Sequence, residues 1–340
     1  MLKKIFSLFF TLVLVGSLWA AGKSEDKSTS AVSGVTKVFR VALFNPESHP
    51  MSQGVKKLGE ILSQKTNGRL SFEIYYGGQL GTQHVVYQAV QSGAIDISIS
   101  PVGITADYGA TKLKVYTLPY LFRSVQQAKN AHRSAKGLEL LNHIQESGTR
   151  MVGLGFFQEP SARNYFFKDK RVTRMADMRG LKMRTQEGAI YLETNAIFGI
   201  NTTSIAFSEL YGALQTGIVD GAEQPFSGYF TNRLHEVSKY YLLNGHEIAP
   251  NVLLMSEMIW NTLPEGDRKL LRDCFIEASD WYNSDSAQKD AEYIKAIKAA
   301  GVEIIEPDNP DEWRAAVKPI YDKYGADFKD IIEAFQKLPY

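Results

Sequence analysis

The sequence predicts an α/β protein built as two similar lobes. Three observations support this prediction: a ten-residue pattern occurs twice, strands and helices alternate around both copies, and a long helical tract follows Pro264. The pattern, at 87–96 and 211–220, reads Tyr, any residue, Ala, Val or Leu, Gln, Ser or Thr, Gly, any residue, Ile or Val, Asp. A helix that ends on glycine and leads into a buried strand is typical of a parallel α/β sheet.

The first lobe begins with a predicted strand over 38–44. Ser48 and Pro50 are start signals for a helix with an apolar face, and Gly68 ends it. The elements that follow are a strand, a glycine turn, a helix and a strand, over 70–76, 77–81, 83–92 and 94–100. The order β-α-β-α-β indicates a small parallel sheet.

The second lobe repeats this order. Its predicted elements are a strand, a helix ended by Gly199, a strand, a helix capped by Ser208 and a strand, over 180–185, 189–198, 203–207, 208–216 and 218–222. The apolar segment 150–158 is a buried strand that could run from one lobe towards the other.

The long helical tract reaches Ala300 and stops at Gly301. At 1.5 Å per residue it would extend roughly 50 Å, so we expect it to brace both lobes. We assign 37–160 plus about 250–289 to lobe I, and 161–249 plus about 290–340 to lobe II.

The N-terminus predicts export to the periplasm. Lys3 and Lys4 precede an apolar run over 5–18, and small residues near 20–22 offer a cleavage site, so we expect a signal peptide over 1–22 and a flexible leader over 23–36. A retained anchor is the alternative, but the run is shorter than the roughly 20 residues of a membrane span.

Composition and charge narrow the functional classes. The formal charge is +1, and removal of the two leader lysines gives +1 − 2 = −1, so nucleic acid is not expected as a partner. The only cysteine, Cys274, lies among apolar residues at helical spacing and reads as a core residue, because one cysteine cannot form an internal disulfide.

Candidate binding residues follow from a rule for open α/β sheets, in which ligands bind beyond the carboxyl ends of strands. In the first lobe the rule selects 44–49, which contains Asn45 and His49, together with Gln83 and 98–101; in the second it selects Arg184, Phe207 and 222–224, which contains Gln224. The glutamines could hydrogen-bond hydroxyl groups or merely cap helices. Phe207 could form a platform for an apolar ligand face, or belong to the core.

Arg184 is the principal candidate. A guanidinium presents a planar fork of donors that matches a carboxylate and stays charged when water is excluded, so an anionic small ligand is its natural match. A solvated arginine, or an internal pair with Glu187, is the alternative, and position does not decide between them. Arg163, just after the crossing strand, is a weaker second candidate.

Signals for catalysis, metals and cofactors are missing from the sequence. The pair His246–Glu247, like His49 and His84, lacks the partner histidine of a zinc helix. The sequence has no G-x-S-x-G motif, which would mark a hydrolase nucleophile. Gly153 and Gly155 alone do not make the glycine-rich loop of a dinucleotide-binding site. We therefore expect a protein that is not an enzyme and that uses no cofactor.

The segments "ADMRGLKMR" (176–184) and "AFSELYGALQTGIVDGAEQP" (206–225), with "GGQLG" and "LPYLF", resemble the DctP-type solute-binding proteins of tripartite ATP-independent periplasmic (TRAP) transporters. The resemblance runs from about Val38 into the last helices. It implies a two-lobed periplasmic-binding-protein type II fold whose hinge-linked lobes close on an organic acid, which is handed to a membrane permease driven by a sodium gradient.

The resemblance also implies roles for particular residues. It makes Arg184 the carboxylate clamp and Arg163 a second carboxylate contact, matches Phe207 to the family's phenylalanine, and places Gln224 where asparagine is usual. Gln83 and Pro101 stand where sialic-acid binders are acidic, which argues against sialic acid. The runs 48–50 and 184–187 look more like members that bind sugar acids, including uronates; a C4-dicarboxylate or 2-oxo acid ligand, or a sensor subunit, is the alternative.

Overall fold

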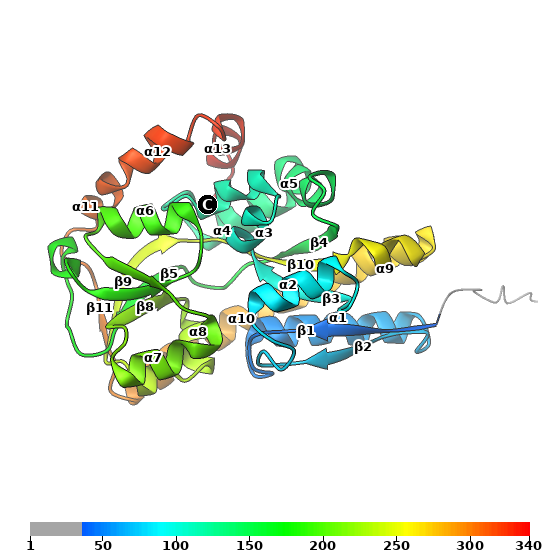
Figure 1. Cartoon of the computed structure of the whole chain (residues 1–340), viewed down its shortest axis with the longest axis horizontal. Helices are drawn as coiled ribbons and strands as arrows, with labels where there is room; N and C mark the ends of the chain where they lie inside the picture. Colours follow the sequence, from blue (N-terminus) through cyan, green and yellow to red (C-terminus); the bar gives the residue numbers. More distant parts are fainter. Residues whose placement is uncertain (1–35) are drawn as a thin grey trace, which may run out of the picture. The chain divides into compact units, whose positions relative to one another are not determined.

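The computed structural model describes residues 36–340 (Figure 1). The predicted signal peptide and almost all of the predicted leader therefore lie outside the described residues. Within this range, no helix combines the length and hydrophobicity that crossing a bilayer requires.

Two β-sheets organise the fold (Figure 1). Sheet A contains β1 (Lys37–Ala42), β2 (Leu70–Tyr75), β3 (Ile97–Pro101), β4 (Met151–Phe157) and β10 (Asn251–Ser256) in the order β2-β1-β3-β10-β4. Sheet B contains β5 (Arg163–Phe167), β6 (Lys182–Thr185), β7 (Asn201–Ser204), β8 (Gly221–Gln224), β9 (Tyr240–Glu247) and β11 (Glu303–Ile305) in the order β11-β9-β5-β8-β6-β7. The predicted α/β architecture is confirmed.

Helices connect the strands of each sheet. Those that accompany sheet A are α1 (Pro50–Lys65), α2 (Gln83–Gln91), α3 (Val102–Asp107), α4 (Val125–Arg133), α5 (Ala135–Glu146) and α9 (Glu257–Thr262), with a 3₁₀ helix at Thr111–Thr117. Those that accompany sheet B are α6 (Ala189–Ile197), α7 (Leu210–Thr216), α8 (Phe226–Thr231) and α11 (Pro310–Ala316), with 3₁₀ helices at Met175–Met178, Phe207–Glu209 and Leu234–Glu236. The chain ends with α12 (Lys318–Tyr324) and α13 (Lys329–Gln336).

The repeated ten-residue pattern builds the same junction in both sheets. Gly93 and Gly217 end α2 and α7 with φ of 75° and 76°, a left-handed conformation that favours glycine. Asp96 Oδ2 then accepts the backbone N–H of Arg40 at 2.7 Å, and Asp220 Oδ2 accepts that of Lys182 at 2.8 Å. Each aspartate thereby ties the start of one strand to its parallel neighbour, β3 to β1 and β8 to β6.

Three sequence predictions near the second junction are wrong in detail. β7 spans 201–204 rather than 203–207, because it pairs residue by residue with β6 and ends where β6 ends. β8 spans 221–224 rather than 218–222. Ser208 caps no helix: it lies inside the 3₁₀ turn that begins at Phe207, and α7 starts only at Leu210.

The long helix α10 (Glu265–Ala299) has 35 residues and matches the predicted tract. It packs against α1 beside sheet A and against α8 beside sheet B, as the bracing prediction requires. Tyr282 of α10 contacts the ring of Phe157, with centroids 5.1 Å apart, and Tyr293 stacks on Phe230 at 5.0 Å. Cys274 is fully buried on this helix, as predicted.

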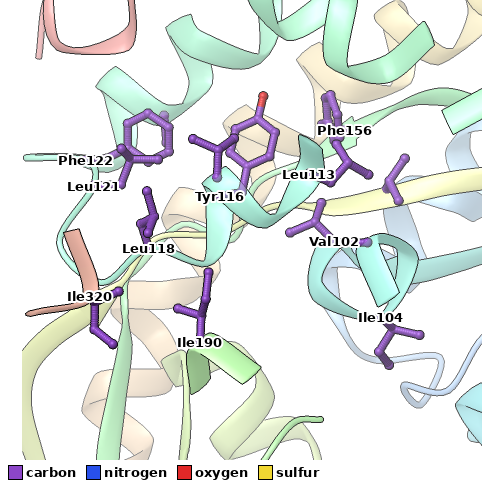
Figure 2. Close-up of a cluster of buried hydrophobic side chains, with 14 of the residues drawn as sticks. Val102, Ile104, Leu113, Tyr116, Leu118, Leu121, Phe122, Phe156, Ile190 and Ile320 are labelled. Carbon is purple, nitrogen blue, oxygen red and sulfur yellow. The ribbon is translucent and has the colours of Figure 1, made fainter. Parts of the chain in front are cut away.

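The chain crosses between the sheets at 158–162 and 248–250, and again along α10. The last helices return to elements near sheet A: Gln127 Nε2 of α4 donates to the carbonyl of Phe335 at 3.2 Å. One hydrophobic cluster joins these parts, and Figure 2 shows Leu118 next to Ile190 of α6 and Ile320 of α12. The residue boundaries given above for the two lobes stay a prediction.

Candidate functional site

All seven predicted binding residues line one cavity of about 30 Å³, namely Asn45, His49, Gln83, Arg163, Arg184, Phe207 and Gln224. They come from both sheets. Asn45 and His49 follow β1, Gln83 opens α2, and Gln224 ends β8, so the strand-end rule brings together residues far apart in sequence. A neighbouring cavity of about 90 Å³ shares Gln83, Arg184 and Phe207 with it.

Side chains from the two sheets touch across this cavity. The rings of Phe44 and Phe207 meet edge to face with centroids 6.3 Å apart. Asn232 Nδ2 donates to Asn45 Oδ1 at 3.4 Å, at the end of α8. These contacts explain why the space is small, since each face supplies side chains that fill the gap between the sheets.

Arg184 is buried, and no carboxylate in the described part of the chain contacts it. Its side chain is 3% exposed; Nε donates to the carbonyl of Ile205 at 3.0 Å, and the guanidinium lies 5.7 Å from the ring centre of Phe207. Nη1 has no hydrogen-bond partner, and among residues 36–340 no carboxylate lies within 4 Å of this guanidinium. Burial lowers the pKa of Arg184 to about 10, because the charged form loses its water.

The sequence left open an internal ion pair between Arg184 and Glu187, but in the structure Glu187 contacts His84. Its Oε2 lies 2.8 Å from Nε2 of His84 across the gap between the sheets. Both side chains are substantially exposed, so this contact contributes little to stability. Glu187 therefore forms no ion pair with Arg184, which lines the cavity.

Arg163 lines the same cavity but is already paired. Nε contacts the carboxylate of Glu223 and lies 3.4 Å from Oε2 of Glu247, while Nη2 donates to the carbonyl of Glu223 at 3.0 Å. Burial lowers the pKa of Arg163, but the two carboxylates outweigh it and the net pKa is raised. This arginine therefore differs from Arg184 in having its charge balanced within the protein.

The guanidinium of Arg163 contacts two buried carboxylates, those of Glu223 and Glu247. Glu223, His246 and Glu247 offer ligand atoms that all lie within 4.8 Å of one another, a grouping that the sequence did not reveal. Because the guanidinium of Arg163 contacts the carboxylates of Glu223 and Glu247, these two acids already face a cation. Burial raises the pKa of Glu247 to about 7, although Arg163 and a hydrogen bond from Tyr191 to Oε1 at 2.8 Å favour its charged form.

His49 and Glu159 form a second buried group at the cavity. His49 Nδ1 accepts the N–H of Met51 at 3.1 Å and thereby caps α1, which leaves the proton of the neutral ring on Nε2. Burial lowers the pKa of His49 to about 3, so its 3.7 Å approach to Glu159 Oε1 is not an ion pair. Burial raises the pKa of Glu159 to about 7, while Ser227 donates to its Oε2 at 2.7 Å.

Sequence reasoning missed three polar residues that line the cavity: Glu159, Gln186 and Asn251. Gln186 follows β6 directly, so the strand-end rule could have included it. Asn251 begins β10, which runs antiparallel to β3 and pairs Asn251 with Pro101. The rule for parallel strands cannot find such a residue, because an antiparallel strand brings its amino end to the same edge.

The sequence profile of the bacterial extracellular solute-binding proteins, family 7 (DctP), matches residues 41–327. The chain belongs to this family. DctP-type proteins of TRAP transporters are transport components that bind small organic acids outside the cytoplasm and work with membrane permeases.

One relative of this DctP-type chain is the C4-dicarboxylate-binding periplasmic protein DctP of Rhodobacter capsulatus, 28% identical, with 81% of this chain and 82% of the relative covered. A TRAP periplasmic solute-binding protein of Pseudomonas putida F1 with bound D-glucuronate is similar with a TM-score of 0.86 and 27% identity, over 89% of this chain and 98% of that chain. Another, from a Bradyrhizobium species with bound D-galacturonate, has a TM-score of 0.84 and 28% identity, over 88% and 99%.

Proposed function

We propose that this protein captures a sugar acid with a single carboxylate, most simply a uronate, and delivers it to a TRAP permease. One observation carries the proposal: Arg184 is buried at the cavity with no carboxylate within 4 Å in the described part of the chain. Holding such a charge out of water is costly unless an anion compensates it. A ligand carboxylate would supply that anion and two parallel hydrogen bonds.

The pairing of Arg163 favours one ligand carboxylate rather than two. Its charge is balanced by Glu223 and Glu247, so Arg184 is the cavity-lining arginine left for an incoming anion. A C4-dicarboxylate would bring a second negative charge next to Glu159. A monocarboxylate avoids this repulsion.

The rest of the lining suits hydroxyl groups. Five side-chain amides face the cavity, from Asn45, Gln83, Gln186, Gln224 and Asn251. An amide can both donate and accept hydrogen bonds, as a sugar hydroxyl does. The related structures with bound glucuronate and galacturonate support the same ligand class.

During capture, the two sheets would close on the ligand from opposite sides. A carboxylate docks first on Arg184 of sheet B, and closure about the crossing segments 158–162 and 248–250 brings Asn45 and Gln83 onto the hydroxyl groups. Closure excludes water and strengthens the charge-assisted bonds. The predicted signal peptide over residues 1–22 would place this event in the periplasm, where the closed form meets the permease.

Isothermal titration calorimetry with matched ligands tests the proposal. D-glucuronate and D-galacturonate should bind with a measurable enthalpy, whereas D-glucose, which lacks the carboxylate, should not. Succinate should bind more weakly than the uronates, and sialic acid should not bind. Tighter binding of succinate than of either uronate would contradict the assignment of a single carboxylate site.

A thermal-shift screen extends the panel to aldonates and 2-oxo acids. A ligand at a thousandfold excess over its Kd stabilises the folded state by about 4 kcal/mol. If none of these acids raises the melting temperature, the proposed ligand class is wrong.

A further inference from the structure

A second cavity, of about 330 Å³, lies between α4, α5, β4 and α10 and shares no lining residue with the cavity at Arg184. We name it the α4–α10 cavity. Its walls are mainly apolar: Leu138, Leu141, Leu154, Phe156, Phe275 and Ile276. Leu138 and Ile276 are more than half exposed, which opens the apolar wall to solvent. Space of this size suits a small organic molecule.

Two cations face this apolar space without a counter-charge. Lys129 of α4 and Arg272 of α10 line the cavity, and no carboxylate among residues 36–340 lies within 4 Å of either. Arg272 instead donates to the carbonyl of Gly153 at 3.4 Å and lies 5.0 Å from the ring centre of Trp260. The third cation of the lining, Arg133, is paired with Asp280.

Burial makes the charges of Lys129 and Arg272 unfavourable as they stand. Burial lowers the pKa of Lys129, and the nearby charge of Arg133 lowers it further. Burial also lowers the pKa of Arg272. An anion in the cavity would relieve both effects, since opposite charge favours the protonated forms.

Two buried polar side chains also lack partners at this cavity. Gln158 Oε1 and His132 Nε2 are buried and make no hydrogen bond, although both residues line the space. Burial lowers the pKa of His132 to about 3, so its neutral ring can donate one hydrogen bond to an anion. Buried polar atoms normally have partners, so these two side chains have hydrogen-bonding capacity that no described residue uses.

We propose that the α4–α10 cavity binds a small amphipathic organic acid. Its carboxylate would lie between Lys129 and Arg272, within reach of His132. Its hydrocarbon part would pack on the leucines and Phe275 towards the exposed side chains of Leu138 and Ile276. The site does not depend on the proposed uronate function. Gln158 nevertheless adjoins Glu159, which lines the other cavity, so a bound acid would contact the crossing segment 158–162.

Calorimetry with decanoate at low salt tests this site, with decanol and decylammonium as uncharged and cationic probes of the same length. Decanoate should bind with 1:1 stoichiometry, and the other two should bind at least tenfold more weakly. Lys129→Gln and Arg272→Gln should each weaken decanoate binding about three- to tenfold, and together by more than tenfold, as loss of a partly exposed charge contact predicts.

Matched variants separate the site from general charge effects. Lys269→Gln removes an exposed cation one turn before Arg272 on α10, where Lys269 is paired with Asp273, and should leave decanoate binding unchanged. Arg184→Met should remove uronate binding but keep decanoate binding. Leu138→Trp, at an exposed position on the wall, should block decanoate without disturbing the core.

Three results would overturn the proposal: no saturable decanoate binding, equal binding of decanol or decylammonium, or unchanged affinity in the folded double variant. Adsorption to vesicles of anionic phospholipid without saturable decanoate binding would also reject it.

Discussion

Replacing Arg184 with methionine should stabilise the ligand-free protein while it removes ligand binding. The guanidinium is buried, and burial lowers its pKa to about 10. Each tenfold change in an acid constant corresponds to about 1.4 kcal/mol, so keeping this charge out of water costs about 3 kcal/mol. Methionine fills much of the same volume with an unbranched, uncharged chain and avoids that cost.

Two lost contacts offset part of the gain. The hydrogen bond from Nε to Ile205 is 3.0 Å long, and the contact with the Phe207 ring is 5.7 Å to its centre. Such interactions contribute about 0.5–1 kcal/mol each. We therefore expect the free energy of unfolding to rise by about 1–2 kcal/mol, and the melting temperature of the ligand-free protein by about 2–4 °C in a thermal scan.

Ligand binding should change in the opposite direction. Truncating one partner of a buried charge pair costs about 2–5 kcal/mol, which is a loss of affinity of about thirtyfold to several thousandfold. Calorimetry with D-glucuronate measures this loss. Arg184→Lys should also weaken binding, because an ammonium group cannot make the two parallel hydrogen bonds.

Arg163→Met is the matched control, since both arginines line the cavity but only Arg163 is paired. Its removal leaves Glu223 and Glu247 buried without their cation, which should lower the free energy of unfolding by about 3–5 kcal/mol. If Arg184→Met lowers the melting temperature as much as Arg163→Met does, the charge of Arg184 is balanced inside the protein. Unchanged affinity in Arg184→Met would refute its role as the clamp.

Three further substitutions probe the site and the fold. Because burial raises the pKa of Glu159 to about 7, its carboxylate ionises as the pH rises through 7 and repels the ligand, so uronate affinity should fall between pH 6 and 8.5; Glu159→Gln should flatten that calorimetric profile, and a slope that persists in the variant would assign it to another group. For stability, the buried acid costs nothing below its unfolded pKa of 4.5, and the cost grows as the pH rises from there to about 7; the glutamine variant should therefore unfold at higher urea than the wild type by an amount that increases over this range and is constant above it. Asp220→Ala removes the charged acceptor of the Lys182 N–H at 2.8 Å and should lower the free energy of unfolding by about 1–3 kcal/mol in urea titrations; no change would mean that the junction is held by other contacts. Gly155→Ala places a methyl group 1.9 Å from Cε1 of Phe275, so urea titration should show a loss of about 1–3 kcal/mol, and a loss under 0.5 kcal/mol would show that the ring moves aside freely.

Local chemistry was enough to predict most elements and to select residues that share one cavity. The helix starts at Pro50 and Gln83, the glycine stops and the long helix depend on neighbouring residues, so their signals are present in short segments. The strand-end rule then selected six of the seven candidate residues that line one cavity, because parallel strands with helical connections bring their carboxyl ends to one edge; Arg163, which begins β5, was chosen for its place after the crossing strand. Even the errors at β7 and Ser208 are local, a matter of where a strand ends against its partner.

Which charged side chains pair with one another could be determined only from the folded structure. The sequence ranked Arg163 below Arg184 but did not show how either charge is balanced; in the structure Arg163 lies against Glu223 and Glu247, Arg184 has no carboxylate within 4 Å among residues 36–340, and Glu187 contacts His84 instead. Pairing of this kind joins residues 60 or more positions apart, and the energy of a charge depends on burial and on distances of a few ångströms. Residue order therefore specifies the folding units and the edge where they meet, whereas only the packing of both sheets decides which arginine contacts carboxylates and which does not.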